Sequence, residues 1–71
     1  MGKRHVIPSQ RPGEGWQVTE ASTGEPEYHA ANQADAVDRA CAELARNGGG
    51  EVVIHGIRGL VQDKRTVRPA G

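Results

Sequence analysis

Aromatic residues are nearly absent from this sequence of 71 residues, which has one Trp, one Tyr and no Phe. The core must therefore be built from Val, Ile, Leu and Ala, with Trp16 as its only large anchor. A domain of this length buries about 60% of the surface that its unfolded chain exposes, so its core is thin. A thin core leaves little room for an enclosed ligand pocket, which needs about 300 Å³ or more. We therefore expect a single domain that is not an enzyme.

Cysteine and long apolar runs are also scarce. The single Cys41 excludes an intramolecular disulfide and a cysteine-rich zinc site. No apolar run approaches the roughly 20 residues of a membrane helix, and no signal-peptide core follows the basic start. From these absences we expect a cytoplasmic protein with no membrane partner.

The net charge is zero, but the charges are segregated along the chain. Residues 1–13 and 52–71 together carry seven Lys and Arg against one acid, whereas residues 14–51 carry eight acids against two Arg. The two ends therefore sum to +6 and the middle to −6. A chain polarised in this way presents a basic surface if its two ends meet in space.

Three strands are expected before any helix. Residues 4–9 favour a short strand that ends near a proline, and residues 10–15 form a turn rich in Pro and Gly. In residues 16–22 apolar and polar side chains alternate, as in a strand with one buried face. Residues 28–31 predict a third, shorter strand.

A helix is expected between Asn32 and Asn47. Asn32 is a good N-cap, and Asp35 lies in the first turn, where its charge meets the positive end of the helix dipole. The three glycines at 48–50 end the helix, because glycine readily adopts the left-handed conformation found there. The predicted buried stripe consists of Ala34, Val37, Cys41 and Leu44, widened by Ala40 and Ala45.

Two further strands follow the helix, one beginning at residue 51 and one over residues 60–67. The sum is an α+β fold, with a small antiparallel sheet of four to five strands in the order β-β-(β)-α-β-β and one helix packed on one face. We expect one domain over residues 4–67, with flexible termini at 1–3 and 68–71. The other sheet face is left to solvent or a partner. The predicted core contains Trp16, Val18, Val37, Cys41, Leu44, Val52 and Ile54.

Three histidines and one cysteine are the candidates for metal binding or catalysis. No two of His5, His29, His55 and Cys41 have the short i, i+3 or i, i+4 spacing of metal ligands. Cys41 is expected in the buried stripe, whereas a nucleophilic cysteine needs an exposed thiolate. We therefore predict no metal site, no cofactor and no catalytic residue. His55 is expected on the strand face that points away from the helix, where its ring can stack on a partner or form a hydrogen bond.

The basic ends are the main functional signal, because cations gathered on one surface bind phosphates by counterion release. We expect a non-enzymatic binding module that uses the exposed sheet face and the basic outer strands, with nucleic acid or a protein as its partner. Against nucleic acid stand the neutral total charge and the lack of interleaved aromatic residues. The alternative is a homo-oligomeric structural or accessory protein that pairs through the exposed sheet face. The candidate binding surface consists of His5, His55, Arg58, Lys64 and Arg65.

Three short segments, in this order, carry a resemblance to a known family. They are His5-Val6-Ile7-Pro8, Gly15-Trp16-Gln17-Val18 and Val52-Val53-Ile54-His55, within a similarity that covers about residues 4–65. The sequence resembles the small bacterial domain-of-unknown-function family 2188. The resemblance implies a one-helix α+β fold and brings no established activity. The chain departs from the family at its last hairpin, where Arg58-Gly59 replaces the usual Asp-Gly or Asn-Gly, so the turn is expected to differ.

Overall fold

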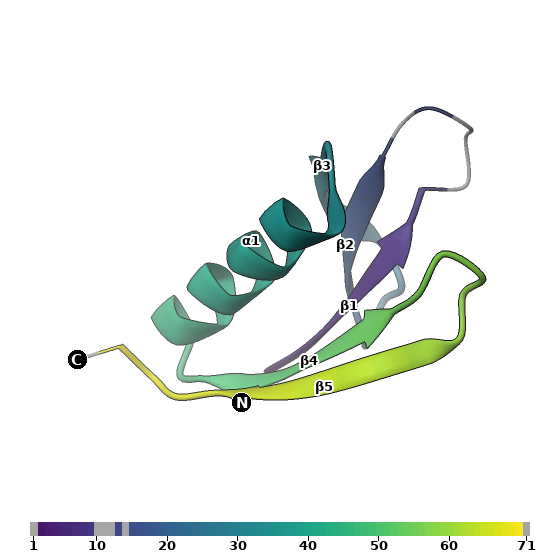
Figure 1. Cartoon of the computed structure of the whole chain (residues 1–71). Helices are drawn as coiled ribbons and strands as arrows, with labels where there is room; N and C mark the ends of the chain where they lie inside the picture. Colours follow the sequence, from purple (N-terminus) through teal and green to yellow (C-terminus); the bar gives the residue numbers. More distant parts are fainter. Residues whose placement is uncertain (1, 10–12, 14, 71) are drawn as a thin grey trace.

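The computed structural model describes residues 2–9, 13 and 15–70, which form a five-stranded sheet with a helix on one face (Figure 1). The elements, in chain order, are β1 (Gly2–Pro8), β2 (Trp16–Glu20), β3 (Pro26–Ala30), α1 (Gln33–Arg46), β4 (Gly50–His55) and β5 (Val61–Val67). The predicted α+β fold with its β-β-β-α-β-β order is confirmed. Of the turn predicted over residues 10–15, residues 10–12 and 14 lie outside the described residues.

The strand order across the sheet is β3-β2-β1-β4-β5. β1 lies in the centre, antiparallel to β2 and parallel to β4. The sheet is therefore mixed, whereas the sequence predicted an antiparallel one. A parallel pair needs a long crossover between its strands, and here β2, β3 and α1 together provide it.

The helix begins and ends as the sequence predicts. The Asn32 side chain accepts a hydrogen bond from the Asp35 backbone N–H at 2.9 Å. At the other end, the Asn47 and Gly49 N–H groups both donate to the Leu44 carbonyl, at 3.1 and 2.7 Å. Gly49 has a φ of +84°, the left-handed conformation expected after a helix end.

The buried side of α1 is rotated relative to the predicted stripe. Ala36 is buried together with Val37, Ala40 and Leu44, whereas the predicted Ala34 is exposed. Ala34 instead lines a groove beside β5. The reason is that α1 packs chiefly on β1 and extends little over β5, so the side facing β5 is not covered.

The core lies between α1 and the three strands β2, β1 and β4. Burying a Val, Leu or Ile side chain stabilises the fold by about 1.5–3 kcal/mol, so this layer supplies most of the stability. Of the predicted core residues, Trp16 and Cys41 are only partly buried and pack against its margin. The buried cluster consists of Val6, Val18, Ala36, Val37, Ala40, Leu44, Val52 and Ile54.

One cation, Arg4, points to the same side of the sheet as this core and is nearly buried. Its Nη1 lies 3.4 Å from Glu20 Oε1, and its Nε lies 2.6 Å from Glu27 Oε1. The Nε–H does not point at this second oxygen, so the contact is an ion pair rather than a directed hydrogen bond. A buried charge must be paired, and the two carboxylates meet that need. Arg4 is therefore neutralised inside the fold and is not part of a basic surface.

Residues near both ends of the chain make contacts with the rest of the fold. Gly2 and Lys3 belong to β1, and Gly2 pairs with Gly50. Near the other terminus, the Ala70 N–H donates to the Ala45 carbonyl at 2.9 Å, which ties the chain after β5 to the end of α1. Residues 1 and 71 lie outside the described residues.

Candidate functional site

The sheet face that points away from α1, which we call the open face, is the candidate site. Side chains alternate between the two faces of a strand, so the neighbours of the core residues point to this face. Within the described residues it is formed by Lys3, His5 and Ile7 of β1, Gln17 and Thr19 of β2, Glu51, Val53 and His55 of β4, and Val61, Lys64 and Thr66 of β5.

His5 and His55 form a pair in the middle of the open face. Parallel pairing places β1 beside β4, so that His5 Nδ1 lies 2.9 Å from His55 Nε2. The ring centroids are 5.2 Å apart, and the ring planes are inclined by 38°. Because the two residues are 50 positions apart in the sequence, only the fold brings them together.

A third contact determines which ring nitrogens of this pair carry hydrogens. His55 Nδ1 lies 2.8 Å from the Gly59 carbonyl oxygen, which can only accept, so His55 Nδ1 carries a hydrogen and donates. In the neutral pair, His55 Nε2 is then the acceptor and His5 Nδ1–H is the donor. Burial, the neighbouring His55 and the charge of Lys3 lower the pKa of His5, and Glu51 opposes them. The pair accommodates one extra proton, whereas two would place two N–H groups against each other.

The turn after β4 is held by His55 and does not strain Arg58. The Gly59 N–H donates to the Gly56 carbonyl at 2.9 Å, and the Gly56 N–H donates to the Leu60 carbonyl at 2.8 Å. Gly59 has a φ of +83°, whereas Arg58 has a negative φ. The glycine thus provides the left-handed residue that the turn requires. An arginine in place of the family's Asp or Asn is therefore compatible with a hydrogen-bonded turn.

The predicted cations do not all meet on one surface. Lys64 lies on the open face opposite Val53, and Arg58 is exposed in the turn beside His55. Arg65 points to the helix side, where it lines the groove between α1 and β5. Of the five predicted surface residues, the open face therefore brings together His5, His55 and Lys64.

Two polar residues and one cation of the open face were missed by the sequence prediction. Gln17 and Thr19 are both buried there although the helix lies on the other side, because neighbouring side chains cover them. Lys3 lies opposite Glu51, with 3.7 Å between Nζ and Oε1, and both side chains are about half exposed. Lys3 is next to Arg4 in β1, and Gln17 and Thr19 flank Val18 in β2. Because neighbouring side chains of a strand point to opposite faces, this alternation is the signal in the sequence that places the three residues on the open face.

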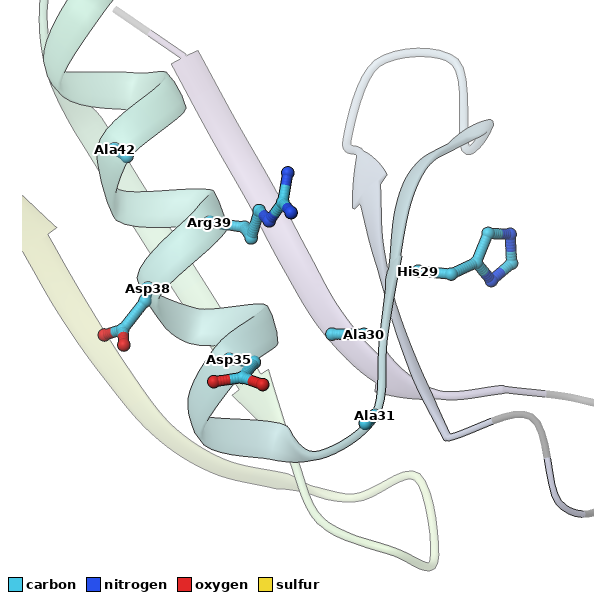
Figure 2. Close-up of a pocket in the computed structure, with 7 residues that line it drawn as sticks. All are labelled: His29, Ala30, Ala31, Asp35, Asp38, Arg39 and Ala42. Carbon is cyan, nitrogen blue, oxygen red and sulfur yellow. The ribbon is translucent and has the colours of Figure 1, made fainter.

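A groove between α1 and β3, of about 550 Å³, is the obvious alternative to the open face (Figure 2). Arg39 reaches toward β3 in this groove, whereas the His29 ring points to the opposite side of β3. Asp35 and Asp38 lie along the helix, and three alanines line the remainder. The polar groups do not converge on one point, as the groups of a ligand site do.

A second groove, of about 590 Å³, lies at the end of the sheet where β1 begins and β5 ends. It continues the open face, since Lys3, Glu51 and Thr66 line both. Arg68 adds a second cation to its rim, and glycine residues form much of its wall. The basic character of the open face therefore extends past Lys3.

Metal-binding and nucleophilic chemistry have little support in the residues that the structure describes. Among them, no three His, Cys, Asp or Glu residues gather as metal ligands do. Burial raises the pKa of the Cys41 thiol, which disfavours the reactive thiolate. In the same part of the chain, no helix is long and apolar enough to cross a membrane.

Comparisons with known proteins assign the chain to a family. The model of the family described as "Uncharacterized protein conserved in bacteria (DUF2188)" matches residues 4–67, and the chain belongs to this family. The resemblance found in the sequence is thereby confirmed. Neither the curated proteins nor the solved structures contain a match.

Proposed function

We propose that this protein is a cytoplasmic, non-enzymatic binding module whose open face binds single-stranded nucleic acid. One observation carries the proposal: the His5–His55 pair lies on the uncovered side of the sheet. Lys3 lies on the same face two residues before His5, and Lys64 lies on the same face of the strand beside β4. Flat rings and cations side by side on a sheet are the two components that single-strand binders combine.

Each component has a distinct task. The imidazole rings offer flat surfaces on which bases can stack, in place of the aromatic residues that the sequence lacks. Lys64, Lys3 and Arg58 lie around the rings, where they can contact phosphates. Glu51 is the carboxylate of this face, and Lys3 already balances it. The acids of α1 lie on the other side of the sheet, so they repel a bound polyanion only weakly.

The small apolar area of the open face favours this function over pairing of two copies through that face. Val53 is only 2% exposed, so it offers almost no further surface to bury. The exposed large apolar residues among the described residues are Ile57 and Leu60, in the turn between β4 and β5, and Val61, which begins β5 opposite His55 at one end of the open face. Association through the open face would therefore gain little hydrophobic stabilisation.

Fluorescence anisotropy with short, labelled, mixed-sequence DNA and RNA strands tests the proposal. Three cations in contact with phosphates predict a slope of about −2 in the plot of log affinity against log salt concentration. Lys64→Ala should weaken binding and make the slope less negative by about 0.7.

Arg46→Ala is the matched control. It also removes one cation, but from the last turn of α1 on the other side of the molecule. It should leave the salt slope unchanged. The absence of binding at low salt, or equal effects of the two substitutions, would contradict the proposal.

A further inference from the structure

The sheet ends in two edge strands that differ in their protection. β3 has five residues, begins with Pro26 and pairs with β2 through a register shift at Val18/Thr19. Proline and bulges both discourage pairing of an edge with another chain. β5 has seven residues without proline, six of them exposed. Its register shift lies at its beginning, so that Asp63 to Val67 form a regular edge.

The helix leaves this edge accessible. Figure 1 shows β5 along the margin of the sheet, outside the part that α1 covers. A groove of about 310 Å³ separates β5 from α1, and both Asp63 and Arg65 line it. Leu60 lies just before β5 and Val61 is its first residue, and these side chains are 75% and 56% exposed. Apolar exposure beside a free edge is typical of a strand that pairs with a partner.

The charges of β5 are complementary to those of a second β5. In a twofold antiparallel pair, opposed residues must share a face of the sheet, so the axis passes through a residue. With the axis at Lys64, Asp63 of each copy lies opposite Arg65 of the other. Both residues point to the helix side, since they pair with Ile54 and Val52 of β4. An axis at Asp63 or at Arg65 would oppose two like charges and form no opposite-charge pair, whereas an axis at Lys64 opposes two lysines but forms two opposite-charge pairs.

We propose that two copies of this chain associate through antiparallel pairing of β5 with β5, with Lys64 on the twofold axis. The association joins the two sheets into one and forms two Asp63–Arg65 pairs, in which Arg65 of the second copy contacts a carboxylate that accepts from the Lys64 N–H at 2.8 Å in the single chain. Opposite charges across a strand pair stabilise it, whereas the two Lys64 side chains on the axis repel each other. The short edge and this repulsion make the dimer weak and dependent on concentration.

Charge exchange tests the register, with sedimentation equilibrium as the measurement. Asp63→Arg opposes two arginines and Arg65→Asp opposes two aspartates, so each should weaken dimerisation about tenfold. The double variant with both changes restores the opposite-charge pairs and should dimerise within about threefold of the wild type. This double variant is the matched control. If the two substitutions weakened dimerisation by damaging the fold, their effects would add in the double variant, whereas a restored charge pair makes them cancel.

Lys64→Thr provides an independent test, since it removes the repulsion on the axis from an exposed position. It should strengthen dimerisation, by about threefold or more. Thermal denaturation of each variant checks that it is folded. A wild type that sediments as a monomer at every concentration overturns the proposal. A double variant as weak as the single ones, or an unchanged dimerisation constant in Lys64→Thr, overturns it as well.

Discussion

The two faces of the sheet are made by the same strands and have opposite characters. On the helix side, β1, β2 and β4 contribute Val6, Val18 and Val52, which are all fully buried. On the open face, the same strands contribute His5, Thr19 and His55. The His5 and His55 rings lie against each other and share a hydrogen bond. The cation of β1 that points to the helix side, Arg4, is paired with two carboxylates there.

The difference indicates a division of tasks. Stability in a chain of this size depends on a few apolar side chains, because the core is thin. Most of these side chains lie against α1, and Val53 is the buried apolar residue that the open face adds among the described residues. The histidine pair and the two lysines of the open face lie outside this apolar layer, and we propose that they contact a partner.

The largest expected effect is on the helix side. Leu44→Ala should lower the free energy of unfolding by about 3 kcal/mol, because it removes a fully buried side chain and leaves a cavity. Lys64→Ala on the open face should change it by less than about 0.5 kcal/mol, since Lys64 is exposed. Urea denaturation of both variants measures the contrast. Similar losses in the two variants would mean that the faces do not divide the tasks in this way.

An intermediate effect concerns the pH dependence of stability. The pKa of His5 is lowered in the folded protein, chiefly by burial. In the unfolded chain His5 keeps its ordinary pKa of about 6.5, so below this pH the unfolded chain binds more protons than the folded protein. The free energy of unfolding should therefore fall as the pH drops below about 6.5, and this loss should level off below the folded-state pKa. Hydrogen bonds from Ser22 lower the pKa of Glu20 from 4.5, so its contribution is lost only at more acidic pH.

His5→Gln isolates the histidine contribution. Thermal denaturation of this variant should show a smaller decrease in Tm than the wild type between about pH 7 and 5.5. Protonation also adds positive charge to the open face, so nucleic-acid affinity should rise over the range in which stability falls. Equal decreases in Tm for the two proteins would show that His5 does not contribute to the pH dependence of stability in this way.

The smallest expected effect is at the tip of the last hairpin. Arg58→Asn introduces the Asn-Gly turn that is usual in the family. Because Gly59 alone takes the left-handed conformation, the free energy of unfolding should change by less than about 0.5 kcal/mol. A gain of more than about 1 kcal/mol in urea denaturation would show that Arg58 strains the turn.

Local signals predicted the elements of the fold well. The Asn32 cap, the glycines after Asn47 and the alternation in the strands act over a few residues, and the structure contains each of them. The buried side of α1 was harder to predict, because alanines occupy both Ala34 and Ala36. Which of them is covered depends on how far α1 reaches over β5, and this is a tertiary property.

The candidate site was predictable only in part, because it depends on strand order. Alternation within β4 placed His55 on the face away from the helix. Its contact with His5 requires β1 and β4 to be parallel neighbours, and no local pattern specifies such a pairing. The same holds for Arg4, whose burial follows from Glu20 and Glu27 on strands β2 and β3. Its charge therefore counted toward a basic surface in the sequence, although the fold neutralises it.

The central claim is that the open face binds and the helix side stabilises. A backbone NMR titration with a short, mixed-sequence single strand tests it most directly, because every amide reports separately. We predict shifts at His5, Val53, His55 and Lys64, with unchanged signals from Asp38 and Ala42 on the outer side of α1. Shifts confined to α1, or no shifts at low salt, would contradict the account.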